Sequence, residues 1–246
     1  LLEHPGIAAR IAGIAGKPIE RTLAALPDRV SSMIDEIARR SISKALDVAV
    51  KTMDPTRPAA AADWWHKLAA GASGAAGGAF GMAGLAVELP ISTTIMLRSI
   101  ADIARSQGED LKTPESRLEC LHVLALGGSS KADDATDAGY FASRAALAQA
   151  IASASQYLAQ HGTAKGSAPV LVRLISEVAS RFSIAVSEKA LAQAVPMIGA
   201  IGGGAINALF IDHFQDMGRG HFTVRRLERA HGTDVVREAY LALPRR

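Results

Sequence analysis

The chain has 246 residues, of which 49% are hydrophobic and only 4% aromatic, and its formal net charge is +3 at pH 7. This length can bury a hydrophobic core unaided, and the single cysteine excludes an intrachain disulfide and a zinc cluster built on cysteines. The small positive charge is not gathered into a basic block, so we predict no nucleic-acid partner.

The first 54 residues are expected to form a helical arm ahead of a helical domain at residues 55–246. Prolines and glycines interrupt residues 1–27, which predicts short helical pieces packed on the outside. From Asp28, a favourable residue for a helix N-cap, apolar side chains recur every three or four residues as far as Asp54. This pattern predicts an amphipathic helix.

Two segments without charged side chains, residues 68–87 and 190–211, dominate the rest of the sequence. Each is near the ~20 residues that a membrane-spanning helix requires. Glycines spaced four apart, such as Gly74 and Gly78, let two helix backbones approach closely, so we expect the segments to pack on each other. The many glycines of the first segment favour a pair of buried central helices over a spanning hairpin. An arrangement that shelters the segments in solution and exposes them at a membrane stays open.

Five apolar side chains in or beside these segments are candidates for membrane contact. Trp64 and Trp65 directly precede the first segment, an arrangement typical of an interfacial aromatic anchor. Phe80 lies in the first segment, and Ile198 and Ile201 lie in the second. The alternative for the tryptophans is that one packs into the core and the other covers its edge.

Helix start and stop signals divide the remaining sequence, and no stretch has the alternation of a β-strand. A helix is expected to begin at Pro90 and end before Gly108, and another to run from Thr113 to the Gly127-Gly128 pair. Further helices are expected over residues 137–161, from residue 169 into the second uncharged segment, and over 222–231 and 233–243. The chain is therefore predicted to be all-α, a multi-helix bundle with the two Gly/Ala-rich helices at its centre.

Several polar residues lie close to the uncharged segments and would be buried if the segments pair. Buried charged groups need partners, and Glu88 is expected to pair with Arg98, Arg144 or Lys189. One interpretation is an internal network that orients the helices; the other is a pocket for a lipid head group or a partner peptide. The candidate pocket residues are Glu88, Pro90, Thr93, Thr94, Arg98, Arg144 and Asn207.

The motifs of common catalytic classes are missing from the sequence. There is no Gly-x-Ser-x-Gly and no phosphate-binding loop, and the Ser-x-x-Lys match at Ser41 lacks the elements that accompany it in known enzymes. Asp212, His213 and Asp216 are candidates for a metal site, but a helix directs His213 away from the two carboxylates. A helix likewise separates Cys120 from His122. We predict no metal and no cofactor.

The sequence resembles the EcsC protein family. The resemblance lies in Gly81-Met-Ala-Gly84, in the run from Glu88-Leu-Pro90 to Arg105, in Asp137-Ala-Gly-Tyr140 and in Pro196-Met-Ile-Gly199, with the order and spacing of these runs. It extends from about Asp63 to Tyr240, so the domain at 55–246 is EcsC-like. The resemblance implies a bacterial protein, from a family named for an operon that also encodes an ABC transporter, and it transfers no catalytic residue.

These observations predict a non-catalytic accessory protein that associates with a membrane or lipid, with an ABC transporter as the partner that the resemblance suggests. We expect it in the cytoplasm or on the cytoplasmic face of the bacterial inner membrane. Two alternatives stay open. One is a hydrolase that uses a polar cluster around Glu88, Thr94, Arg98 and His213, and the other is a soluble scaffold that binds a helical protein.

Overall fold

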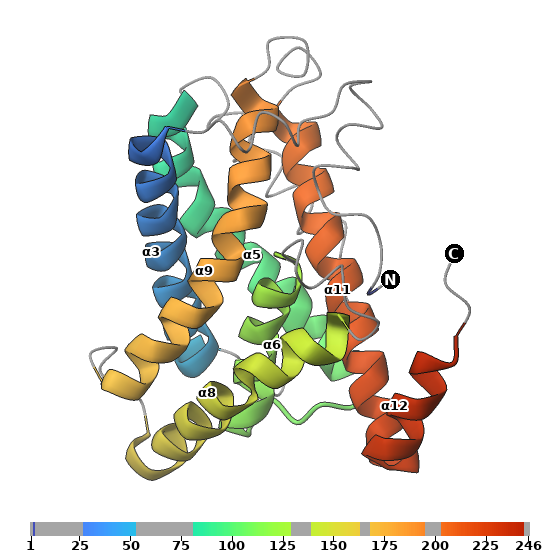
Figure 1. Ribbon diagram of the computed structural model, residues 1–246. Coiled ribbons are helices and arrows are strands. Elements are labelled where there is room, and N and C mark those ends of the chain that lie inside the picture. The colour runs from blue at the N-terminus through green and yellow to red at the C-terminus, as the bar shows by residue number, and fades with distance from the viewer. Residues whose placement is uncertain are drawn as a thin grey trace.

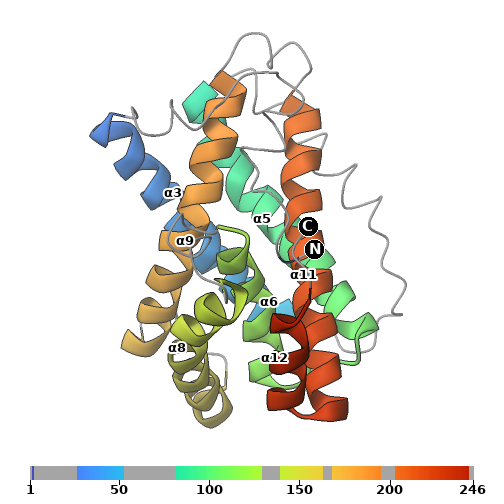
Figure 2. The same cartoon turned by 45° about the vertical axis from the view of Figure 1, so that its right-hand side comes forward.

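The computed structural model describes residue 2 and residues 27–52, 81–128, 139–162, 168–194 and 203–243. Every regular element in these ranges is an α-helix (Figure 1). The helices pack as a multi-helix bundle, which confirms the predicted fold class (Figure 2). They are α3 (Asp28–Thr52), α5 (Gly81–Ser106), α6 (Pro114–Leu126), α8 (Gly139–His161), α9 (Pro169–Ala194), α11 (Gly203–His231) and α12 (Thr233–Leu241).

The short helix α6 lies at the centre of the described part of the bundle. It contacts α3, α5, α8, α9 and α11, and all its residues from 118 to 126 are buried. Most of these residues are apolar, as expected of an enclosed helix, but Glu119 and His122 are buried among them. A polar pair on the most enclosed helix is therefore a feature that needs explanation.

Local sequence signals set both ends of α6. Thr113 is its N-cap, and the Thr113 hydroxyl accepts a hydrogen bond from the backbone N–H of Ser116 at 3.3 Å, with Pro114 in the first turn. The helix ends at Gly127 and Gly128, as predicted. A Cβ atom added to Gly128 would collide with the carbonyl oxygen of Arg181 on α9, so glycine permits the close approach of these two helices.

Two helix boundaries differ from the prediction. α5 begins at Gly81 and contains Pro90 in its interior, and α11 continues through Gly218 and Gly220 instead of breaking there. A proline inside a helix costs about 3 kcal/mol and a glycine about 1 kcal/mol. Burial on the surrounding turns, such as that of Leu89, offsets these local costs. The segment predicted as a separate helix at 222–231 is thus the last part of α11.

Several predictions fall outside the described residues. These are the pieces before residue 27 and the membrane-contact candidates Trp64, Trp65, Phe80, Ile198 and Ile201. The pairing of the two Gly/Ala-rich segments also depends largely on such residues. α3, the described part of the predicted arm, packs against α5, α9 and α6 and contributes to the main core.

Candidate functional site

The residues predicted to line one pocket belong to several places in the structure. Glu88 on α5 and Asn207 on α11 meet the ammonium group of Lys189 on α9, one of the three partners expected for Glu88. The Lys189 Nζ atom donates to the two carboxylate oxygens at 2.9 and 2.8 Å and to Asn207 Oδ1 at 2.7 Å. Burial lowers the pKa of Lys189, and the attraction of Glu88 only partly reverses this. These are the contacts of an internal network that ties three helices together.

The other α5 candidates are not in that network. Thr94 donates a hydrogen bond to the backbone oxygen of Pro90 at 2.8 Å, Thr93 is buried, and the Arg98 side chain is exposed. His213 is buried on α11, where its Nε2 nitrogen lies 2.8 Å from the carbonyl oxygen of Gly127. The four residues considered for a hydrolase therefore have separate surroundings.

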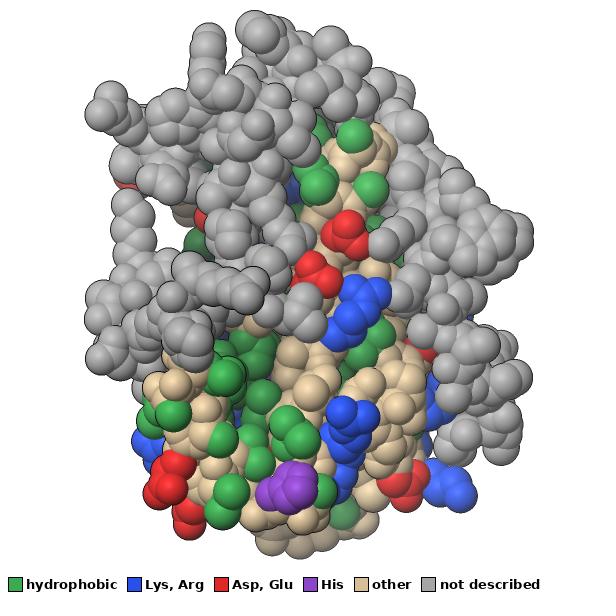
Figure 3. Space-filling model, turned by 90° about the vertical axis from the view of Figure 1, so that its right-hand side faces the viewer, with side chains coloured by type: hydrophobic (Ala, Val, Ile, Leu, Met, Phe, Trp, Pro, Cys, Tyr) green, Lys and Arg blue, Asp and Glu red, His purple; other side chains and the backbone are tan. Residues whose placement is uncertain are grey.

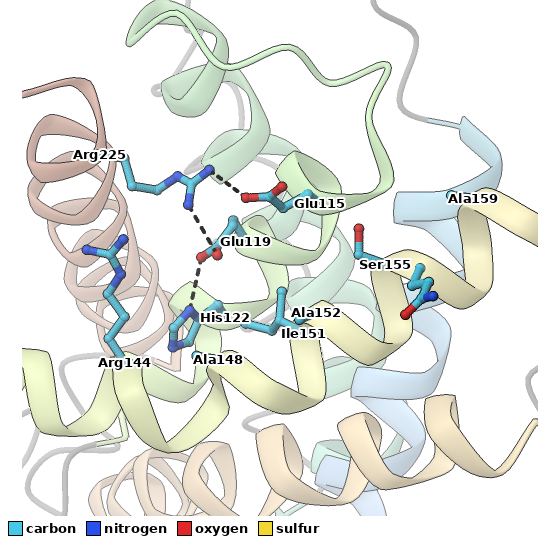
Figure 4. A pocket seen from close by; sticks show the side chains of 11 residues that line it. Glu115, Glu119, His122, Arg144, Ala148, Ile151, Ala152, Ser155, Ala159 and Arg225 are labelled. Atoms are coloured by element: carbon cyan, nitrogen blue, oxygen red, sulfur yellow. Dashed lines mark hydrogen bonds and ion pairs between the residues drawn. The ribbon is translucent and has the colours of Figure 1, made fainter. Parts of the chain in front are cut away.

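A pocket of about 530 Å³ lies between α6, α8 and α11 (Figure 4). Of the predicted pocket residues, Arg144 is the one that lines it. Its wall combines charged side chains with small and apolar ones from α8. The lining residues are Glu115, Glu119, His122, Arg144, Ala148, Ile151, Ala152, Ser155, Gln156, Ala159 and Arg225.

Glu119 is the centre of a buried polar cluster at this pocket. Its Oε2 atom lies 3.0 Å from Nδ1 of His122, which is three residues later on α6, and 3.0 Å from Nε2 of His221 on α11. Its Oε1 atom lies 3.2 Å from a guanidinium nitrogen of Arg225. Burial raises the pKa of Glu119, but the hydrogen bonds from the two histidines outweigh burial and hold the pKa well below its ordinary value. The carboxylate is therefore ionised and accepts every one of these hydrogen bonds.

The protonation of His221 follows from its two neighbours. Because Glu119 only accepts, His221 carries its proton on Nε2, and Nδ1 accepts from the hydroxyl of Tyr140 on α8 at 2.9 Å. Burial lowers the pKa of His221 to about 4 and raises the pKa of the Tyr140 hydroxyl above its ordinary value. At neutral pH the histidine is thus uncharged and the tyrosine is protonated.

Ion pairs hold the arginines at the edge of the pocket. Arg225 donates to Glu109 at 2.9 and 3.3 Å and lies 3.5 Å from Glu115. Arg144 on α8 forms a bidentate ion pair with Glu228 on α11, in which its two terminal nitrogens donate to the two carboxylate oxygens at 2.7 and 2.8 Å. Since both guanidinium groups are already paired, the pocket does not offer an unbalanced positive charge to an anion.

Sequence analysis missed most of this cluster. Glu119 and His122 have Glu-x-x-His spacing, which places two metal-capable side chains on one face of a helix and could have been recognised. Their partner His221 lies 102 residues beyond Glu119, so only the fold brings it close.

Within the described residues, Glu119, His122 and His221 are the only group of three or more side chains arranged to hold a metal ion. One potential ligand atom from each lies within 4.8 Å of the others, and all three residues are buried. The metal candidates from the sequence, Asp212, His213 and Asp216, form no such group; Asp216, for example, pairs with Arg219 at 3.0 Å.

Comparison with known proteins gives one match. The sequence model of the EcsC protein family matches residues 7–227, which is most of the chain. No curated protein and no solved structure matches it. The matched range includes α3 to α9 and most of α11, with every member of the Glu119 cluster. By this match, the chain belongs to the EcsC protein family.

Proposed function

We propose that the protein is an accessory protein that associates with membranes through one end of the helical bundle. This is the end where α5 and α11 begin and α9 ends, at the top of Figure 1. The described parts of the two uncharged segments, residues 81–87, 190–194 and 203–211, lie toward this end. Contact with lipid hydrocarbon there requires a surface without charged side chains.

The observation that carries the proposal is the complete burial of Lys189 against Glu88. Glu88 is the single charged residue of α5 between residues 84 and 97, and Lys189 is the last charged residue of α9. α11 has no charged residue before Asp212. The ion pair therefore hides two of the three charged side chains that these helices carry near this end, and the third, Glu188 on α9, is half-buried.

The described surface near this end includes large exposed apolar side chains. Val87 is 68% exposed and Ile91 is 42% exposed, although both are large hydrophobic residues. On the face drawn in Figure 3, the described part nearest this end shows hydrophobic side chains, and further along the bundle hydrophobic and charged side chains are mixed. Exposed apolar surface of this kind supports contact with a membrane or an apolar partner.

The proposed contact does not require α5 to cross the bilayer. Gly84–Ser106 is the one described helical stretch long and apolar enough to span a membrane, with a mean hydropathy of 1.2. Because 61% of it is buried inside the bundle, it serves here as a core helix. We therefore propose attachment at the bilayer surface, on the cytoplasmic face. A transporter as the membrane partner is an extension of this proposal, which co-purification tests.

Flotation of the full chain with vesicles of phosphatidylcholine and phosphatidylglycerol tests the proposal. The wild-type protein is expected to float with the vesicles, and Val87→Glu to weaken binding by about tenfold, because burial of a valine contributes roughly 1.5 kcal/mol or more. Val235→Glu is the matched control, since Val235 is 59% exposed on α12. Failure of the wild-type protein to float would refute membrane association and favour the helical scaffold, and equal losses in both variants would refute attachment through this end.

Carbonate washing of membranes from cells distinguishes the two modes of attachment. Release by salt alone supports surface binding, whereas retention after carbonate shows that the chain inserts more deeply than proposed.

A further inference from the structure

We propose that Glu119, His122 and His221 bind one divalent transition-metal ion of the Zn²⁺ class beside the pocket between α6, α8 and α11. The inference does not depend on the membrane role, because it rests on a different part of the bundle. Two imidazoles and one carboxylate are a ligand set that zinc and its neighbours accept readily.

The three side chains already converge on a common point. Glu119 and His122 lie on one face of α6, and His221 reaches the same point from α11, with its ring centre 5.4 Å from that of His122. Bonds from zinc to nitrogen and oxygen are about 2.0–2.2 Å long, so the atoms around a tetrahedral zinc are about 3.4 Å apart. Glu119 Oε2 lies 3.0 Å from a nitrogen of each ring, and the ligand atoms are all within 4.8 Å. Small side-chain rotations therefore suffice to surround an ion.

In the metal-free arrangement, two imidazole N–H groups point at the carboxylate. Their protons occupy the place that a cation takes when each nitrogen presents its lone pair instead. Metal binding thus needs each ring to move its proton to the other nitrogen, and the surroundings of both rings permit this change.

For His221 the outer partner is a hydroxyl. The Tyr140 hydroxyl donates to Nδ1 in the metal-free protein and can accept from the same nitrogen once Nε2 binds the metal, because a hydroxyl is both donor and acceptor. Histidines that bind metals nearly always have such an oxygen on the other ring nitrogen. Arg225 takes the same role for Glu119, since it lies 3.2 Å from Oε1 and leaves Oε2 for the ion.

For His122 the inner nitrogen, Nδ1, donates to Glu119 at 3.0 Å in the metal-free protein, and a metal ion would replace this hydrogen bond. Its Nε2 nitrogen is buried and has no hydrogen-bond partner among the described residues, so Nε2 is not occupied as an acceptor and can take the proton. A buried polar atom without a partner is unusual in a folded protein. It marks this cluster as one whose hydrogen-bonding capacity the protein alone does not use up.

The surrounding charges favour a cation. The carboxylates that share this ion-pair cluster outnumber the guanidinium groups, three against two, which leaves an excess of one negative charge. The groups are Glu109, Glu115 and Glu119 against Arg225 and Arg229.

The number of ligands indicates the type of site. Structural zinc sites are closed by four protein ligands, whereas catalytic sites use three and keep one position for water or substrate. Here three protein ligands lie beside a pocket of about 530 Å³, and two of them, Glu119 and His122, line it. The site is therefore of the open type.

Metal binding to the full chain tests the proposal. The protein is stripped with EDTA, desalted and dialysed against buffered Zn²⁺, and bound zinc is counted by mass spectrometry; Co²⁺ binding is followed by its visible absorption. We expect one ion per chain, and a loss of binding in Glu119→Gln and in His221→Gln. His213→Gln is the matched control, because His213 is also buried on α11 but lies outside the cluster.

A conservative variant keeps the test decisive if these replacements unfold the chain. Tyr140→Phe removes one hydroxyl and no ligand, and loss of an outer partner typically weakens metal binding 10- to 100-fold. Absence of bound metal in the wild-type protein would overturn the proposal. So would unchanged affinity in Tyr140→Phe, or binding that survives in a folded Glu119→Gln variant, since metal would then be held elsewhere.

Discussion

Replacement of Lys189 by methionine tests whether the Glu88–Lys189 pair has the structural role assigned to it. The Lys189 side chain is completely buried and that of Glu88 is 3% exposed. Removal of one partner of a buried ion pair leaves the other charge without compensation and costs about 3–5 kcal/mol. Since most domains are stable by only about 5–15 kcal/mol, Lys189→Met should lose a large part of the free energy of unfolding.

The double variant Glu88→Leu, Lys189→Met separates the cost of a stranded charge from the net value of the pair. Apolar replacement of a whole buried pair is often neutral, so the double variant should regain at least about 2 kcal/mol relative to Lys189→Met. Urea denaturation followed by circular dichroism measures both, with Lys44→Met on the exposed face of α3 as the control. A cost below about 1 kcal/mol for Lys189→Met, or a double variant no more stable than the single one, would refute the reasoning.

Two further predictions concern acid stability and the packing of α6. In metal-free protein the folded-state pKa of His221 is about 4, below its ordinary value of 6.5, so this group's contribution is complete above pH 6.5 and is lost as the pH falls toward 4. The loss is about 3 kcal/mol in total, and urea titrations at pH 7 and 5 should show a decrease that is smaller in His221→Gln. Gly128→Ala should destabilise the protein by about 1–3 kcal/mol because its methyl group meets the backbone of Arg181. Gly218→Ala is the control, since its Cβ atom would lie 3.7 Å from Ile100, an ordinary contact; equal melting temperatures of the two variants would contradict the packing argument.

Local chemistry explains which parts of the fold could be predicted. The start of α6 at Thr113 and its end at Gly127 depend on capping and on backbone conformation, which neighbouring residues determine. Pro90 and Gly218 gave wrong boundaries because their local preference for a break is smaller than the burial of the helices around them. Sequence signals of this kind are reliable only where tertiary packing does not oppose them.

The candidate site was less predictable because its members come from distant parts of the chain. A buried Glu88 requires a cationic partner, and the sequence analysis named three candidates. In the structure the partner is Lys189. Glu119 gave no such signal, because it does not border an uncharged segment and its partner His221 lies 102 residues further along the chain. Arg144 was assigned to a pocket, and it does line one, although with neighbours on α6 and α11 instead of α5.

The two buried polar clusters of this bundle differ in whether all their hydrogen-bonding groups have partners, and this difference indicates which cluster could bind a ligand. Each of the three ammonium protons of Lys189 has an acceptor, two from Glu88 and one from Asn207. The ammonium group therefore has no proton left to donate to a ligand. Around Glu119, the hydrogen bonds leave one nitrogen of His122 without a partner, and the cluster borders a pocket. A purely structural role does not require this arrangement, since apolar side chains would fill the centre of α6 at lower cost. The open cluster is therefore the part of the molecule where a ligand has a physical reason to bind.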